Sequence, residues 1–333
     1  MALLLNPNQI PQDLIAQHDR FSPFSKRCIQ FEIQVALIPD QNKFEYRSPQ
    51  DLIRRVIEFE KSEPGGGHLY FHGIPDSKHE VIPEKVRKSQ KRSIVCFTYE
   101  NALHAAILHL HPGGIVYGYL TSNIATQLLS KMDSIPGYIA KSVIHCGAIL
   151  FEVPGVRSKQ GDRCLVSDER RRRQREWWPS VMIQVAVGNA IAMDFLRLDA
   201  EWWLMNSDKN TRFVILVKLE TDPFALHIEC WMMVETGRRQ TRLTPALIPR
   251  CVQDFDINEA GDVTSIMGST ELEVPYGCIF DEVPNPSPPA TTLSIAELSA
   301  FALWLFETLG GLVFCTLILF PASILTRHYQ MLD

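Results

Sequence analysis

The chain has 333 residues, a length that fits one large domain or two ordinary ones. Hydrophobic residues make up 46% of the chain and charged residues 21%, which excludes a disordered, a collagenous or a multi-span membrane protein. Lysine and arginine total 33 against 38 aspartate and glutamate residues, and this net charge of −5 leaves any nucleic-acid binding to a local basic patch.

The first 92 residues are predicted to form an N-terminal extension that ends in a linker. Residues 28–38 show partial alternation of apolar side chains and are a candidate strand. Residues 50–61 place apolar side chains near helical spacing, which predicts an amphipathic helix. Residues 76–92 are strongly charged and are predicted to form a linker or a long surface loop.

Strands alternate with helices between residues 93 and 235. Strands are predicted over 93–99, 104–110, 143–151, a short stretch through Val166, 179–187, 211–219 and 224–233. Helices are predicted over 122–132, with Ser122 as the start signal, and over 190–205. The nearly continuous apolar run at 179–187 suits a strand covered on both faces. This alternation predicts an α/β (α+β) core with helices flanking a mixed sheet.

The last hundred residues divide into a turn-rich extension at 236–292, with a linker-like 284–289, and apolar helices at 293–333. Residues 308–326 carry no charge, and a membrane-spanning helix needs about 20 apolar residues. The length and the lack of charge favour a single-pass anchor. The alternative is a buried helical hairpin formed with residues 293–306, for which Ser294 is the predicted N-cap.

The cysteines and the N-terminus indicate the cellular compartment of the protein. The eight cysteines include no C-x-x-C pair, so the sequence has neither a zinc-ribbon nor a thioredoxin motif. The apolar start from Met1 to Leu5 is shorter than the stretch of about 7–15 residues that a secretion signal needs. We therefore expect reduced thiols in a protein that is membrane-associated through 308–326, or otherwise cytoplasmic or nuclear.

Two positions in the middle third have the spacing of a phosphodiesterase site. Asp162 is predicted to end a hairpin strand, and Gln184 lies in the middle of the next strand. Metal-dependent phosphodiesterases place carboxylates on adjacent strands to hold Mg²⁺, with a lysine near the attacked phosphate. Here the second position offers an amide, which brings no charge to a divalent ion.

Several motifs together resemble a group of fungal proteins that look like remote members of the PD-(D/E)XK, restriction-endonuclease-like superfamily. The match covers about residues 95–235 and rests on Tyr99, the helix at 122–132, Pro154-Gly155-Val156, Lys159-Gln160-Gly161-Asp162, Trp178-Pro179-Ser180-Val181, Gln184-Val185-Ala186-Val187, Leu196-Arg197-Leu198-Asp199-Ala200, Trp202-Trp203-Leu204 and Val214-Ile215-Leu216. The resemblance implies a restriction-endonuclease-like core over 93–235. It also implies Asp162 as the first acidic position and as the metal ligand, with Lys159 as the nearest basic candidate.

The sequence departs from this family pattern at the second half of the site. Gln184 stands where the pattern has glutamate, and Val185-Ala186 offers no lysine two residues later. These departures favour a pseudo-nuclease without a cofactor, in which the core binds nucleic acid or a protein. The enzyme alternative is a Mg²⁺-dependent nuclease with a rearranged site, where Asp199, Glu201 or Glu229 supplies the missing carboxylate. A third alternative is a membrane-anchored protein of another role.

One dense basic cluster precedes the Trp-Pro motif and comprises Arg170, Arg171, Arg172, Arg173 and Arg175. A phosphate-contacting loop, a nuclear import signal and a solvated loop of mutually repelling arginines are all consistent with it. The adjacent Trp177 and Trp178 are expected to pack at the entry of a strand rather than to stack on bases.

Ten histidines raise a metal hypothesis, because His104, His109 and His111 form one cluster in the sequence, and His68, His72 and His79 form a second. Two histidines spaced as His-x-His on a strand place both rings on one face, where they can bind a metal. Since no acidic residue lies nearby in sequence, we expect a solvated pair at a strand edge.

Overall fold

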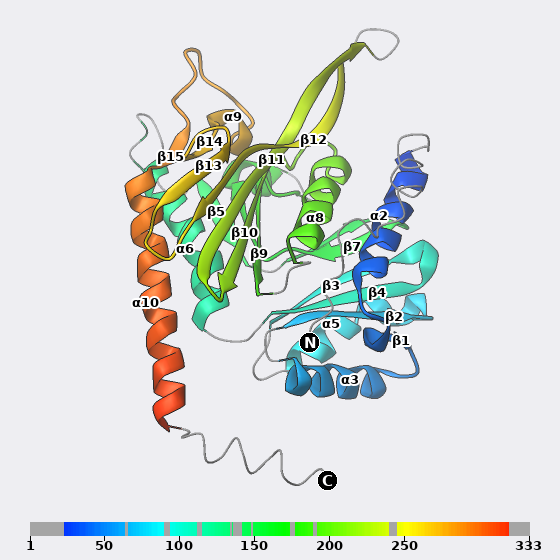
Figure 1. Cartoon of the computed structure of the whole chain (residues 1–333). Coiled ribbons are helices and arrows are strands. Elements are labelled where there is room, and N and C mark those ends of the chain that lie inside the picture. Colours follow the sequence, from blue (N-terminus) through cyan, green and yellow to red (C-terminus); the bar gives the residue numbers. More distant parts are fainter. Residues whose placement is uncertain are drawn as a thin grey trace.

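Two large mixed β-sheets flanked by helices, with a small two-stranded sheet, make up the described part of the chain, which confirms the expected α/β class (Figure 1). The computed structural model describes residues 23–63, 66–89, 94–111, 115–133, 135, 142–147, 149–173, 177–188, 192–239 and 245–319. Strands from before and after residue 92 pair within one sheet, so the N-terminal segment is built into the same architecture as the middle third.

The first sheet has six strands in the order β1-β2-β4-β3-β7-β6, all antiparallel except the parallel pair β1–β2. Its strands are β1 (Lys43–Glu45), β2 (Gly67–His72), β3 (Ile94–Glu100), β4 (Ala105–His111), β6 (Leu150–Val153) and β7 (Arg157–Gln160). Helices α3 (Pro49–Ser62) and α5 (Ile82–Ser89) pack on one face. Helix α2 (Pro23–Leu37) packs on the other face, where Phe31 contacts the side of β4 that carries Ala105 and Ile107.

The second sheet has seven strands in the order β13-β12-β11-β10-β9-β8-β5, with β9 and β10 parallel and the other neighbours antiparallel. Its strands are β5 (Val143–Cys146), β8 (Arg163–Ser167), β9 (Val181–Val187), β10 (Phe213–Thr221), β11 (Phe224–Arg239), β12 (Pro245–Ile257) and β13 (Val263–Met267). Helix α8 (Ala192–Asn206) covers one face, and α6 (Ile115–Met132) and α10 (Ile295–Leu319) cover the other.

Alternate residues of β9 and β10 feed two separate hydrophobic cores of the second sheet. Val181, Ile183 and Val185 face α6 and α10, whereas Met182 and Ala186 face α8. This pattern confirms the prediction from the apolar run that the strand is covered on both faces. It also fixes the direction of Gln184, which lies between Met182 and Ala186 in sequence and therefore points to the α8 side.

The chain order through the second sheet is one helix, three antiparallel strands, a crossover helix and a parallel strand. These elements are α6, β5, β8, β9, α8 and β10. The hairpin β6–β7 interrupts this series between β5 and β8 and pairs instead with β3 of the first sheet. The polypeptide therefore crosses from one sheet to the other at residues 161 and 162.

Short elements complete the fold. They are η2 (Asp40–Asn42), α4 (Asp76–His79), η3 (Asn101–Leu103), α7 (Asp168–Arg173), α9 (Tyr276–Ile279) and the paired strands β14 (Leu272–Val274) and β15 (Thr291–Leu293). Residues 284–289 have no helix or strand, as expected of a linker-like composition.

The N-terminal predictions were right for one element and wrong for two. The amphipathic helix at 50–61 is confirmed as α3, which begins at its N-cap Ser48. The candidate strand at 28–38 is instead the C-terminal part of α2, because its buried residues recur at helical spacing, as at Gln30, Gln34 and Ile38. The charged segment 76–92 contains α4 and α5, since Ile82 and Val86 fold one turn apart onto the first sheet.

Three predictions in the middle of the chain need correction. The strand expected at 143–151 is two strands, β5 and β6, that lie in different sheets. Ser122 does not start a helix, because α6 already begins at Ile115. The arginine run is not a loop up to Arg173 but the short helix α7, in which acidic residues in the first turn precede the arginines.

The turn-rich extension contains more strand than expected. Within 236–292, β12 runs antiparallel to β11 as its partner in a long hairpin that extends beyond the body of the second sheet (Figure 1). The sequence pattern of β12 is irregular because a register shift falls in the pairing, between Cys230 and Trp231 of β11.

The C-terminal helix begins at the predicted cap. The Ser294 hydroxyl and the Glu297 carboxylate form a capping box, and the Glu297 carboxylate also accepts a hydrogen bond from the Ser294 backbone N–H at 3.0 Å. The helix continues without a break to Leu319, so the hairpin between 293–306 and 308–326 is wrong as far as residue 319.

The membrane anchor at 308–326 stays a prediction. Within the part of the chain that the structure describes, no helix meets the length and hydropathy that a bilayer crossing needs. Residues 320–326 of the expected segment lie outside the described residues.

Four aromatic rings form a cluster between α8 and the neighbouring segments, and Trp203 of α8 is its centre. Its ring centroid lies 4.8 Å from that of Trp202, 5.4 Å from that of Phe151 and 5.9 Å from that of Trp178. Trp203→Ala should lower the free energy of unfolding by roughly 3–5 kcal/mol, because a fully buried large ring is removed. Urea denaturation followed by circular dichroism measures the loss.

The matched control for this prediction is Trp304→Ala on α10, where the tryptophan is 39% exposed. This substitution should cost less than about 1 kcal/mol. Equal losses for the two variants would contradict the central role of the buried cluster.

Candidate functional site at the junction of the two sheets

Asp162 lies in the two-residue connection through which the chain passes from β7 of the first sheet to β8 of the second. The preceding residue, Gly161, lies close to β9, because a Cβ there would be 2.6 Å from the Sδ atom of Met182 and 3.2 Å from Nε2 of Gln184, and both side chains would have to shift. The β7–β8 connection therefore packs directly on β9. It thereby brings Asp162 beside the strand that carries Gln184, as the sequence spacing predicts.

The Asp162 carboxylate is 4% exposed and is surrounded by donors from both sheets. Its Oδ1 accepts hydrogen bonds from the Tyr117 hydroxyl at 2.6 Å and from the Cys96 thiol at 3.0 Å. Its Oδ2 accepts one from the backbone N–H of Val185 at 2.7 Å. Burial opposes the charge, but the nearby His111 imidazole and these donors stabilise it, so the pKa of Asp162 is lowered below its ordinary value.

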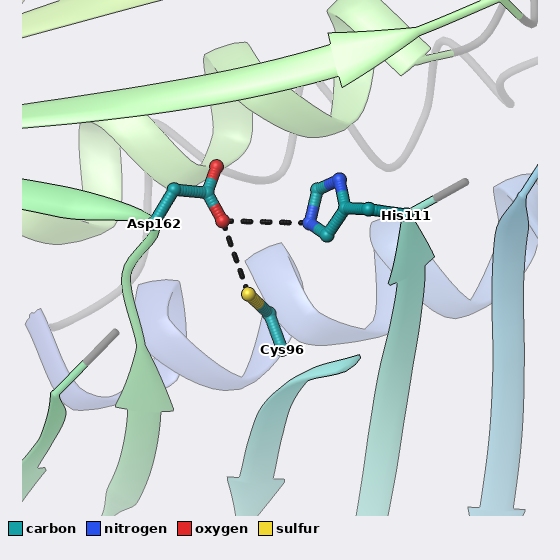
Figure 2. Close-up of side chains that lie close together, drawn as sticks. All are labelled: Cys96, His111 and Asp162. Atoms are coloured by element: carbon teal, nitrogen blue, oxygen red, sulfur yellow. Dashed lines mark hydrogen bonds and ion pairs between the residues drawn. The ribbon is translucent and has the colours of Figure 1, made fainter. Parts of the chain in front are cut away.

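Three side chains from different elements converge in this site (Figure 2). Cys96 comes from β3, His111 ends β4, and Asp162 follows β7. His111 Nε2 lies 3.4 Å from Asp162 Oδ1. Burial raises the pKa of the Cys96 thiol well above its ordinary value, and it raises that of the Tyr117 hydroxyl in the same way. Both groups are therefore protonated donors to the carboxylate.

A continuous row of aromatic rings leads from α8 to this carboxylate. Its members are, in order, Phe195, His68, His109, His111 and Tyr117, with ring centroids 3.7, 4.1, 3.9 and 4.2 Å apart. Burial lowers the pKa of His68 to about 3 and that of His109 well below its ordinary value, so these two imidazoles are neutral.

This row corrects the expectation for the His-x-His pair. His111 is fully buried, and its acidic neighbour Asp162 comes from a segment far away in sequence. The two rings do share one face of β4, as the spacing predicts. That face is turned toward the second sheet rather than toward solvent.

Lys159 is buried but pairs with a different acid. Its Nζ lies 2.5 Å from Asp199 Oδ1 and 3.4 Å from the Thr98 hydroxyl. Gln34 of α2 also donates to Asp199 Oδ1, at 2.6 Å. Burial lowers the pKa of Lys159, although Asp199 opposes this shift. The predicted basic candidate therefore ties β7 to α8 and α2.

Gln184 lies on β9 next to Val185 and is 3% exposed. Its Nε2 has no hydrogen-bond partner among the described residues. In the register of the sheet it stands opposite Leu216 of β10, which in turn stands opposite Glu229 of β11. On this side of β9, strand β10 therefore separates Gln184 from Glu229.

Asp199, Glu201 and Glu229 are the candidates for the second carboxylate of a rearranged metal site, and each of them pairs with another residue. Asp199 binds Lys159, and Glu201 accepts a hydrogen bond from Gln30 of α2 at 2.8 Å. Glu229 accepts hydrogen bonds from Arg197 at 2.9 Å and from the Trp231 indole at 2.7 Å.

Glu229 belongs to a second cluster, with His227 and Asp254, on the outer part of the sheet. Burial opposes its charge, but His227 and Arg197 outweigh this effect and lower the pKa of Glu229 to about 2.

Mg²⁺ does not fit the residues around Asp162. The ligand atoms that gather there within 4.8 Å of one another are those of Cys96, His111 and Asp162, so among the described residues the group holds one carboxylate, a thiol and an imidazole. Mg²⁺ is bound through oxygen ligands and water. This residue set instead has the chemistry of a transition-metal or structural site.

The basic cluster is largely neutralised by neighbouring acids. Arg170 is buried and donates to Asp281 at 2.9 Å, so it is not part of a solvated loop. The more exposed arginines pair with acids of α7 itself, Arg171 and Arg172 with Asp168 and Arg173 with Glu169. Arg175 lies outside the described residues. Trp177 and Trp178 contact Phe151, in agreement with the expected packing role.

Comparison with known proteins gives no family assignment. No protein-family model matches this chain, and no curated protein matches its sequence. The resemblance to restriction-endonuclease-like fungal proteins therefore stays a prediction from the quoted motifs.

Sequence analysis missed two of the residues that contact Asp162. Cys96 and Tyr117 lie 66 and 45 residues before it, and neither belongs to a spaced motif. The alternation in β3 was the available signal, because Phe97 and Tyr99 enter the first core while Cys96 and Thr98 face the second sheet.

The buried His68 predicts a loss of stability in mild acid. Because its pKa falls from an ordinary 6.5 to about 3 on folding, the unfolded chain binds the proton first as the pH decreases. Stability is therefore complete above pH 6.5 and is lost as the pH falls from 6.5 toward 3. One such group contributes about 1.4 kcal/mol per pH unit, or about 2 kcal/mol between pH 6.5 and 5.

His68→Phe keeps a ring between Phe195 and His109 and removes this titration. Its unfolding free energy, measured by urea titration at both pH values, should fall by about 2 kcal/mol less than that of the wild type. His145→Phe, at an exposed histidine of β5, is the control and should keep the wild-type loss. An unchanged loss in His68→Phe would show that the imidazole is not buried in its neutral form.

Proposed function

We propose that this chain is a binding protein built on a restriction-endonuclease-like core that has lost metal-dependent hydrolysis, and that its partner is a protein. The observation that carries the proposal is the enclosure of Asp162. Asp162 is 4% exposed, and its carboxylate accepts hydrogen bonds from Cys96, Tyr117 and the backbone N–H of Val185.

The order and direction of the elements support a restriction-endonuclease-like core over α6, β5, β8, β9, α8 and β10. Three antiparallel strands are followed by a crossover helix and a strand parallel to the third. Asp162 directly precedes the second of these strands, and Gln184 lies in the third. These are the positions at which the sequence resemblance places the two acidic residues of the family pattern.

The chemistry at these positions argues against hydrolysis. Gln184 supplies no negative charge, and the residue two positions later is Ala186. Lys159 is engaged with Asp199, so its ammonium group is held by that carboxylate. A phosphodiester substrate would also have to reach a carboxylate that is 4% exposed. Two-carboxylate metal catalysis needs an open and charged site, and this one is closed.

The charge distribution favours a protein over nucleic acid as the partner. Affinity for a phosphate backbone depends on cationic side chains that are free to displace counterions. In α7, the exposed arginines are paired with Asp168 and Glu169, and Arg173 also lies 3.9 Å from Glu282. The exposed arginines of this run that the structure describes are therefore partly neutralised by neighbouring acids.

An apolar sheet edge offers a surface for such a partner. β13 ends the order of the seven-stranded sheet, and its Ile266 and Met267 side chains are 58% and 48% exposed. Sheet edges bind extended segments of other proteins through backbone hydrogen bonds, with side-chain contacts that give specificity. We therefore place the protein-binding surface at β13.

The first test is hydrolysis. The full chain should cleave single- and double-stranded DNA and RNA no faster than the Asp162→Asn variant when Mg²⁺ or Mn²⁺ is present, because no second carboxylate completes the site. Lys159→Met is a second comparison. Wild-type cleavage that disappears in both variants would overturn the proposed loss of activity.

The second test identifies the class of partner by photocrosslinking in cells. A photoreactive residue at Thr264, on β13, should give one discrete adduct that is sensitive to protease and resistant to nuclease. Ile266→Asp should remove this adduct by placing a charge in the apolar edge. The same photoreactive residue at the exposed Lys61 of α3 is the control and should give no such adduct.

The alternative partner is tested in the same experiment by placing the photoreactive residue at Arg172 of α7. A nuclease-sensitive adduct from Arg172, together with none from Thr264, would replace the protein partner by nucleic acid.

A further inference from the structure

The ligand atoms of Cys96, His111 and Asp162 are arranged nearly as they would be around a tetrahedral metal ion. The Cys96 Sγ atom lies 3.0 Å and the His111 Nε2 atom 3.4 Å from Asp162 Oδ1 (Figure 2). An ion bound at 2.0–2.3 Å separates its tetrahedral ligands by roughly 3.3–3.8 Å. The third separation, between Cys96 Sγ and His111 Nε2, is within 4.8 Å, so the three atoms are close enough together to share one ion.

His111 provides an independent indication of a missing ligand. Its ring is fully buried, and neither Nδ1 nor Nε2 has a hydrogen-bond partner among the described residues. The contact of Nε2 with Asp162 is close enough for an ion pair but lacks hydrogen-bond geometry. Buried polar atoms in native proteins nearly always have a hydrogen-bond partner, so a ring nitrogen with this contact alone points to a bound species.

We propose that Cys96, His111 and Asp162 form a binding site for zinc or a similar borderline-soft divalent cation. Thiolate, imidazole and a single carboxylate are ligands that suit Zn²⁺, whereas Mg²⁺ and Ca²⁺ require mainly oxygen ligands. The site therefore differs in kind from the two-carboxylate Mg²⁺ centre that the sequence resemblance implies.

The charge balance suits a buried site. On binding, the Cys96 thiol loses its proton to solvent and its sulfur bonds to the ion, while the carboxylate binds through an oxygen and the imidazole through an unprotonated ring nitrogen. The two negative ligands cancel the double charge of the cation, so the centre is neutral. A neutral centre avoids the cost of an uncompensated buried charge.

The surrounding residues would orient the ligands. The backbone N–H of Val185 holds Asp162 Oδ2, and the Tyr117 hydroxyl donates to Oδ1, so the carboxylate is positioned from both sides. Because the ligands come from β3, β4 and the β7–β8 connection, the ion would fasten the six-stranded sheet to the seven-stranded sheet.

The test is metal binding by the full chain after removal of bound metal with a chelator. Titration with Co²⁺ should give one equivalent of binding, with the thiolate-to-cobalt charge-transfer absorption that reports a cysteine ligand. Zn²⁺ should displace the Co²⁺ and should raise the thermal unfolding midpoint by several degrees, since it binds the folded state. Mg²⁺ should do neither.

Cys96→Ser should lose the charge-transfer band and the thermal shift. Cys230→Ser, at another fully buried cysteine on β11, is the matched control and should keep both. Absence of the band in the wild type overturns the proposal whether or not the variants fold, as does a band that survives in Cys96→Ser. Neither result depends on whether the chain cleaves or binds nucleic acid, so this proposal and the proposed function fail separately.

Discussion

The packing of the two sheets against each other depends on one buried carboxylate. Asp162 sits at the point where the chain leaves the first sheet, and its oxygens accept hydrogen bonds from β3, α6 and the backbone of β9. A charged group in such a place is stable only when all its neighbours compensate it. Cys96 and Tyr117, which burial keeps protonated, meet that requirement as hydrogen-bond donors to the carboxylate.

The same requirement supports the proposal that this site has lost hydrolytic activity. A catalytic pair of carboxylates needs solvent, substrate and a divalent ion nearby. The oxygens of Asp162 instead accept hydrogen bonds from Cys96, Tyr117 and the backbone of Val185. A second buried polar contact also joins these strands: Arg157 of β7 donates to Glu100 of β3 at 2.7 Å. Polar groups therefore bind the strands of the first sheet together on the face where hydrophobic groups would be expected.

The sequence predicts a segment well when local apolar patterns determine its structure, and poorly when its structure depends on tertiary contacts. The strands at 94–100, 105–111 and 181–187 were found because continuous or alternating apolar residues fix them locally. Helix α2 was missed because its apolar residues also alternate, and only its contacts with α8 decide between the two periods. The positions of Asp162 and Gln184 came from motif spacing, whereas Cys96 and Tyr117 are brought to the site by tertiary packing, which spacing does not encode. The polar face of β4 looked solvent-exposed because alternation cannot distinguish solvent from a polar interface between two sheets.

The placement of the β6–β7 hairpin has a consequence for how the protein is made. β3 and β4 leave the ribosome well before β7, yet the outer edge of β3 is paired only when residues 157–160 arrive. Until then the nascent chain exposes an open strand edge to its surroundings. The second sheet is in turn interrupted between β5 and β8 until the same hairpin has docked. Neither sheet is thus complete before synthesis of the other has begun.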